Sequence, residues 1–173
     1  MNKKQLATFI SAAMNAPLVA ILTFVPLILT QRHHNSNLLI AITTLFGAVL
    51  PLSSTYYLVR KGIIPDIYAS DRSTRTEPFL WAMASYLMGV TALLWFKAPF
   101  VVTALMAVYF VNAIVMLLIT LSWKISIHMV GVMGPLTALM FQLGTRIAPL
   151  MILLLPVAWA RLELKAHNFK QIA

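Results

Sequence analysis

The sequence has no cysteine and few charged residues of either sign. Without cysteine, the chain can form neither disulfides nor thiolate metal sites. Charged residues make up only 10% of the chain and apolar residues 61%, whereas about a quarter of a typical soluble domain is charged. This balance excludes an ordinary soluble domain and predicts an integral membrane protein.

Acidic residues are the scarcest charged group. Four acids stand against thirteen lysines and arginines, which gives a formal charge of +9. The cations come in ones and twos between apolar segments, whereas a nucleic-acid interface needs a broad basic face. We therefore expect membrane lipids and an anionic lipid phosphate as partners, and no nucleic acid. A homo-oligomer is compatible with these features.

The apolar residues form long runs, and about 20 apolar residues suffice to cross a hydrocarbon core of about 30 Å. The first run follows Lys3 and Lys4 and, at about 26 residues, is longer than a signal-peptide core, so we expect a retained span. The sequence predicts an all-α fold, a polytopic helical bundle with about six spans in a single transmembrane domain, residues 1–173. The predicted spans are 5–30, 38–59, 78–96, 99–121, 129–143 and 147–160.

The last two predicted spans are short. Each has about 15 residues and covers about 22 Å as an α-helix, so the pair either crosses with help from flanking residues or turns back as a re-entrant loop. One continuous span is disfavoured because it would place Arg146 near the middle of the bilayer. In either of the first two cases, the chain returns at Arg161 to the side that it left at His128.

The distribution of lysine and arginine predicts the orientation. With this topology, ten cations lie on the side of the N-terminus and three on the other side. Cytoplasmic loops carry the excess of lysine and arginine. We therefore expect the N-terminus, the C-terminus and the candidate site on the cytoplasmic side of an inner or plasma membrane.

Polar side chains that suit phosphate chemistry fall on this same side, partly in the segment "WKISIH" at residues 123–128. Phosphoryl transfer needs cations to hold phosphate oxygens, a nucleophile, and an acid for the leaving group. Arginine pairs two oxygens at once, and histidine can serve either as a nucleophile or as an acid near neutral pH. The candidates are Arg72, Arg75, Lys124, Ser126, His128, Arg161 and His167.

Three short segments resemble the signature of the type-2 phosphatidic acid phosphatase superfamily, whose members work through a phosphohistidine without metal. They are Arg75 in "DRSTRTEP", "SIH" at residues 126–128, and "ARLELKAH", in which Arg161 precedes His167 by six positions. The resemblance covers about residues 66–171. It implies a membrane phosphatase that hydrolyses a lipid phosphate or an isoprenoid diphosphate and uses no cofactor or metal.

The resemblance also implies a role for individual residues. His167 would attack phosphorus and His128 would protonate the leaving group, while Arg75, Arg161 and Ser126 would bind the phosphate. Gln171 stands at the position of the aspartate that orients the nucleophilic histidine.

Two further cations match no signature position. Arg72 and Lys124 are auxiliary phosphate-binding candidates on charge grounds alone.

Three other functions stay open at this point. A lipid-phosphate-binding protein with weakened catalysis is motivated by departures from the signature at Tyr68, Ala160 and Gln171. A prenyl transferase would need clustered aspartates for magnesium, but only Asp66 and Asp71 lie near each other in sequence. A small transporter would often carry a charged residue inside a span, and the predicted spans have none.

Overall fold

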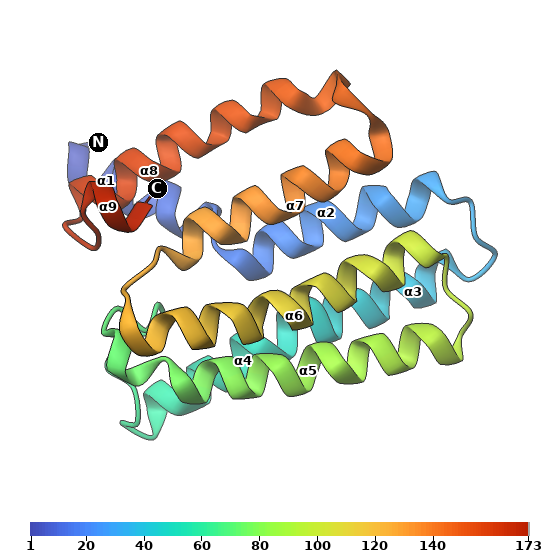
Figure 1. Cartoon of the computed structure of the whole chain (residues 1–173), viewed down its shortest axis with the longest axis horizontal. Helices are drawn as coiled ribbons and strands as arrows, with labels where there is room; N and C mark the ends of the chain where they lie inside the picture. The colour runs from blue at the N-terminus through green and yellow to red at the C-terminus, as the bar shows by residue number, and fades with distance from the viewer. Residues whose placement is uncertain (173) are drawn as a thin grey trace. The chain divides into compact units, whose positions relative to one another are not determined.

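The computed structural model describes residues 1–172, and all regular structure in them is helical. This confirms the all-α prediction. The α-helices are α1 (Lys3–Ala13), α2 (Ala16–Thr30), α3 (Ser36–Thr44), α4 (Leu50–Arg60), α5 (Thr76–Trp95), α6 (Phe100–Ser122), α7 (Ile127–Leu143), α8 (Leu154–Glu163) and α9 (Phe169–Ile172) (Figure 1). A π-helical turn, Leu45–Val49, joins α3 to α4, and 3₁₀ helices cover Arg72–Thr74 and Thr145–Leu153.

Within residues 1–172, four helical segments are long and apolar enough to span a membrane, and a bent pair of helices would make a fifth. The four are Ser36–Arg60, Thr76–Trp95, Phe100–Ser122 and Thr145–Glu163. Helix α7, with 17 residues, is shorter. The helices are those expected of an integral membrane protein, whereas the exact number of six spans stays a prediction.

The bent pair is the predicted first span, 5–30. Helices α1 and α2 meet at an angle of 48° around Met14 and Asn15. Pro17 accounts for the break, because a proline ring clashes with the carbonyl four residues earlier, and that carbonyl belongs to Ala13, the last residue of α1. The predicted first span is therefore built from two helices.

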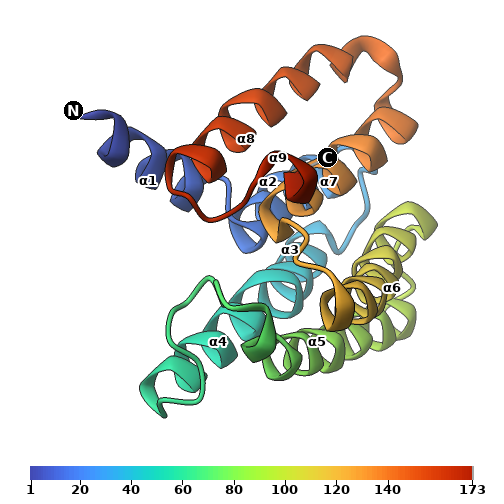
Figure 2. The same ribbon diagram turned by 60° about the vertical axis from the view of Figure 1, so that its left-hand side comes forward.

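Contacts between residues divide the chain into two compact units. Unit 1 consists of Met1–Val19 and the chain from Lys124 onward, and unit 2 consists of Ala20–Trp123. In unit 1, α1 packs against α8, and α7 runs back along the segment formed by the 3₁₀ helix and α8 (Figures 1 and 2). The reversal after α7 occurs at Gly144, whose φ of 82° suits glycine best.

The segment after this reversal is longer than its sequence suggests. Its first nine residues form the 3₁₀ helix Thr145–Leu153 and the next ten form α8. A 3₁₀ helix rises about 2.0 Å per residue and an α-helix about 1.5 Å, so the segment is about 33 Å long. This exceeds the about 22 Å expected of residues 147–160, and the segment is long enough to cross a hydrocarbon core.

Helices α7 and α2 approach closely at Gly131. A Cβ atom added there would lie 2.9 Å from the Cβ of Ala16, whereas one added at Gly134 would have no atom within 4 Å. The sequence predicts that both glycines allow close helix packing, and the structure shows this for Gly131 only. Around them, a core of Val19, Val132, Leu136 and Val157 holds the unit together.

We expect Gly131→Ala to destabilise the protein by about 1–3 kcal/mol, because overpacking forces the two helices apart. Gly134→Ala is the matched control, and we expect it to be neutral or to stabilise by up to about 1 kcal/mol, since alanine favours helix more than glycine does. Thermal unfolding of both variants in one detergent measures the difference. Equal melting temperatures would contradict the close approach at Gly131.

Unit 2 is built around the antiparallel pair α5 and α6, with α3 and α4 packed against α5 (Figure 2). A tight turn joins α5 to α6, in which Ala98 N–H donates to the Leu93 carbonyl and closes the end of α5. Rings of α2, α5 and α6 meet in the interior, where Tyr109 lies 5.6 Å from both Phe24 and Tyr86.

The π-helical turn ends just before Pro51. Leu50 N–H donates five residues back to Leu45, and the next bond of this pattern would run from residue 51 to the Phe46 carbonyl. Proline has no N–H to give. The buried Ser85 hydroxyl of α5 donates to that carbonyl instead, at 2.7 Å.

Candidate functional site

Four buried polar side chains of unit 1 form one hydrogen-bonded network. Arg161 donates from Nη1 to the Ser11 hydroxyl at 2.8 Å and from Nε to His167 Nδ1 at 3.4 Å. The Ser11 hydroxyl also lies 3.4 Å from His128 Nε2. All four residues are at most 7% exposed. The structure therefore brings the two histidines that were predicted to act together into one buried network.

Three of the four side chains come from helix ends that are distant in sequence, and His167 follows in the turn after α8. Ser11 lies in the last turn of α1, His128 in the first turn of α7, and Arg161 in the last turn of α8. Figures 1 and 2 show α1, the end of α8 and α9 gathered at one end of unit 1. The helices that carry these residues thus position them without any long loop.

His167 is held by a turn that folds the chain back onto α8. The backbone N–H groups of Ala166 and His167 both donate to the Arg161 carbonyl, at 3.1 and 3.4 Å. Lys165 takes a left-handed backbone conformation, with φ of 51°, to make this turn. Because arginine can only donate, His167 Nδ1 accepts in this arrangement, and the neutral ring carries its proton on Nε2.

Ser126 and Gln171 connect the C-terminal helix to the start of α7. The fully buried Ser126 donates its backbone N–H to the Gln171 carbonyl at 3.0 Å. Its hydroxyl accepts from Met129 N–H at 3.4 Å and caps α7. The Gln171 side chain accepts from the backbone N–H of Asn168 at 3.1 Å, and Asn168 accepts from Gln171 N–H in return. Phosphate binding by Ser126 and orientation of His167 by Gln171 stay predictions.

The other cations predicted for the site are divided between the units. Lys124 is half-buried in the extended segment that leads to α7, within unit 1.

Arg72 and Arg75 belong to unit 2. Arg75 is 1% exposed and donates from Nε to the Ala69 carbonyl at 2.8 Å. Arg72 donates from Nη1 to the carbonyls of Thr120 and Leu121, at 3.2 and 2.6 Å, and so caps the end of α6. Their grouping with the two histidines stays a prediction.

The charge of unit 1 favours an anionic ligand. Seven lysines and arginines lie in its sequence ranges, against a single acid, Glu163. Glu163 is exposed, and it lies two positions after Arg161 on the same helix, so the two side chains point to different faces. A phosphate placed at the network would meet the Arg161 guanidinium, while the Glu163 carboxylate points to a different face of α8.

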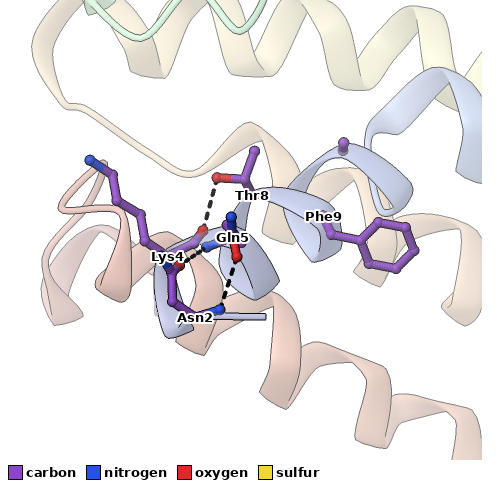
Figure 3. Close-up of a pocket in the computed structure, with 6 residues that line it drawn as sticks. Asn2, Lys4, Gln5, Thr8 and Phe9 are labelled. Atoms are coloured by element: carbon purple, nitrogen blue, oxygen red, sulfur yellow. Dashed lines mark hydrogen bonds between the residues drawn. The ribbon is translucent and has the colours of Figure 1, made fainter.

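A separate pocket of about 460 Å³ lies along the outer face of α1 (Figure 3). It is open to the surroundings, and its floor holds the reciprocal hydrogen bonds between Asn2 and Gln5 that cap the helix. It is lined by Asn2, Lys4, Gln5, Thr8, Phe9 and Ala12. None of these residues belongs to the buried network, so this pocket is not the candidate site.

Sequence reasoning missed Ser11. A serine within an apolar run has no motif around it, and a transmembrane helix tolerates one by bonding its hydroxyl to its own backbone. One signal was available, since Ser11 is followed by Asn15 and Pro17, which interrupt the run and mark a helix end. Polar residues at such an end are candidates for a buried contact.

Comparisons of the chain with family models, curated proteins and solved structures give no match. The geometry must therefore be interpreted on its own. Within residues 1–172, no three histidine or acidic side chains gather where they could hold a metal ion. What the network offers is an arginine, two imidazoles and a hydroxyl in a buried, cationic setting.

Proposed function

We propose that this protein is a membrane phosphatase that removes phosphate from a lipid phosphate or an isoprenoid diphosphate. The observation that carries the proposal is the buried network in which Ser11 and Arg161 join His128 to His167. Two imidazoles and an arginine are the groups that a phosphohistidine mechanism requires. The resemblance of residues 66–171 to the type-2 phosphatidic acid phosphatases supports the same chemistry.

In the proposed reaction, His167 attacks phosphorus and displaces the lipid alkoxide, which takes a proton from the imidazolium of His128. The bond from phosphorus to the lipid oxygen breaks as the bond to nitrogen forms. Neutral His128 then accepts a proton from water, which hydrolyses the phosphohistidine and releases phosphate. Arg161 holds the phosphate oxygens through both steps.

The observed hydrogen bonds indicate one rearrangement that this reaction needs. If Nε2 of His167 attacks, its proton must first move to Nδ1, which accepts from Arg161 in the structure. That bond is long, at 3.4 Å, and so is easily exchanged. A bound phosphate would draw the guanidinium toward its own oxygens and release Nδ1 for protonation.

The proposed setting is the cytoplasmic side of an inner or plasma membrane. Ten of the thirteen lysines and arginines fall on the side of the N-terminus in the six-span topology, and such an excess is typical of the cytoplasmic side. The lipid tail of the substrate would stay among the apolar helices while its headgroup enters the cationic network.

The second candidate function is lipid-phosphate binding without turnover. It is favoured by Gln171, which stands where the resembled signature has an aspartate. The side-chain carbonyl of Gln171 accepts from the backbone N–H of Asn168. A neutral amide stabilises an imidazolium less than a carboxylate does. Such a protein would retain the affinity of Arg161 for phosphate while its histidine turns over slowly or not at all.

Trapping of a phosphorylated intermediate separates the two functions. Purified protein is mixed with phosphatidate carrying a radioactive phosphate, quenched in alkali, and digested to locate the label. We expect a label that is stable in alkali, lost in acid and confined to His167, with or without a chelator. Lipid binding without a trapped label would favour the second function, and a label on another residue would overturn the assigned nucleophile.

A further inference from the structure

We propose that the Ser11 hydroxyl is an internal ligand of Arg161 and His128 that a phosphate displaces when it binds. The inference rests on the proposed function, because it concerns the same site. It adds a residue of α1 that the resembled signature does not include. Ser11 would act as a positioning residue that sets how tightly the site takes a phosphate.

The Ser11 hydroxyl lies within reach of both Arg161 and His128. Ser11 Oγ lies 2.8 Å from Arg161 Nη1 and 3.4 Å from His128 Nε2. Any oxygen that bonds both Arg161 Nη1 and His128 Nε2 must lie close to this position. A phosphate held between Arg161 and His128 would therefore place an oxygen where the serine hydroxyl now is.

Burial makes such an internal ligand necessary. Arg161 is 4% exposed and Ser11 is 2% exposed, so water has little access to the contact between them. A buried guanidinium N–H that loses its acceptor is costly. The hydroxyl satisfies this N–H, and an arriving phosphate oxygen would take over the same role.

The serine also has a second acceptor once it is displaced. A serine or threonine in a helix can donate to the carbonyl four residues earlier, and Thr8 of the same helix does so to Lys4 at 2.9 Å. A change of the Ser11 side-chain rotamer would bring its hydroxyl to the Ala7 carbonyl. The exchange thus leaves neither the hydroxyl nor the arginine unsatisfied.

The ligand is a tetrahedral phosphate with free oxygens, and it could come from a lipid headgroup or from inorganic phosphate. Both sources would compete with the same hydroxyl. The test therefore measures the dissociation constants of inorganic phosphate and of dioctanoyl phosphatidate separately, for the full-length protein in detergent.

We expect Ser11→Ala to tighten binding of both probes by about tenfold or more, the factor that one hydrogen bond to a charged group represents. Ser11→Cys fills the space of the hydroxyl with a weaker hydrogen-bonding group and should shift affinity in the same direction by a smaller factor. Thr8→Val is the matched control, because it removes an exposed hydroxyl of the same helix, and it should leave both constants unchanged.

The outcomes separate this inference from the proposed function. Unchanged or weaker binding in both Ser11 variants, with binding by the unaltered protein intact, would overturn the internal ligand and leave the phosphatase proposal standing. Tightening for phosphatidate alone would also overturn it, because the hydroxyl competes with oxygens that both probes share. No binding of either probe to the unaltered protein or to the two Ser11 variants would overturn both proposals.

Discussion

Replacing His167 by alanine is expected to lower kcat for phosphate release by about 10,000-fold or more, the order of loss seen when a covalent nucleophile is removed. The substitution removes the atom that attacks phosphorus in the proposed reaction. It leaves Arg161 and its contact to Ser11 in place, so we expect phosphate binding to change little. Release of phosphate from phosphatidate and from an isoprenoid diphosphate measures the effect.

His34→Ala is the matched control for this experiment. His34 is an exposed residue of unit 2, with its ring stacked against that of His33, and we expect full activity from the variant. Activity that survives His167→Ala would remove this residue as the nucleophile. Equal losses in the two variants would show that the assay reports folding or contamination instead of the site.

Replacing Arg161 by lysine is expected to lower kcat/KM by about 100- to 1,000-fold, the usual cost of removing one hydrogen-bond donor that stabilises the transition state. Lysine keeps the charge but carries its donors on a single nitrogen, so it lacks the planar fork that reaches two separate partners. Arg161 donates from two separate nitrogens, Nη1 to Ser11 and Nε to His167. We also expect the free energy of unfolding to fall by about 1–3 kcal/mol, because a buried acceptor loses its donor.

Arg146→Lys is the matched control, since Arg146 lies in the same unit and is exposed. Its activity and melting temperature should match those of the unaltered protein. Steady-state kinetics and thermal unfolding of both variants in one detergent make the comparison. Full activity in Arg161→Lys would contradict a role that depends on the shape of the guanidinium.

Long apolar runs and the residues that interrupt them predict much of the fold. The helix ends near Arg60, Ser122 and Leu143 follow the sequence because apolar runs stop there. One feature was missed for a local reason. The segment that leads into α8 winds as a 3₁₀ helix, which lengthens it. Periodicity alone carries no information on such backbone changes.

The site could be predicted in part. His128, His167 and Arg161 were expected to act together from their shared side and from the resemblance to the phosphatase signature, and the structure places them in one network. Ser11 was missed because its role depends on a contact across 150 positions. Arg72 was predicted to bind phosphate because of its charge. In the structure its side chain donates to the carbonyls at the end of α6, a contact that charge alone does not predict.

The contact between Ser11 and Arg161 also has a consequence for the order in which the protein is made. The first helix leaves the ribosome long before Arg161 is synthesised, because the two residues are 150 positions apart. Contacts so distant in sequence form late. Until α8 has been synthesised, α1 lacks this packing partner, and a nascent chain without α8 has no complete network.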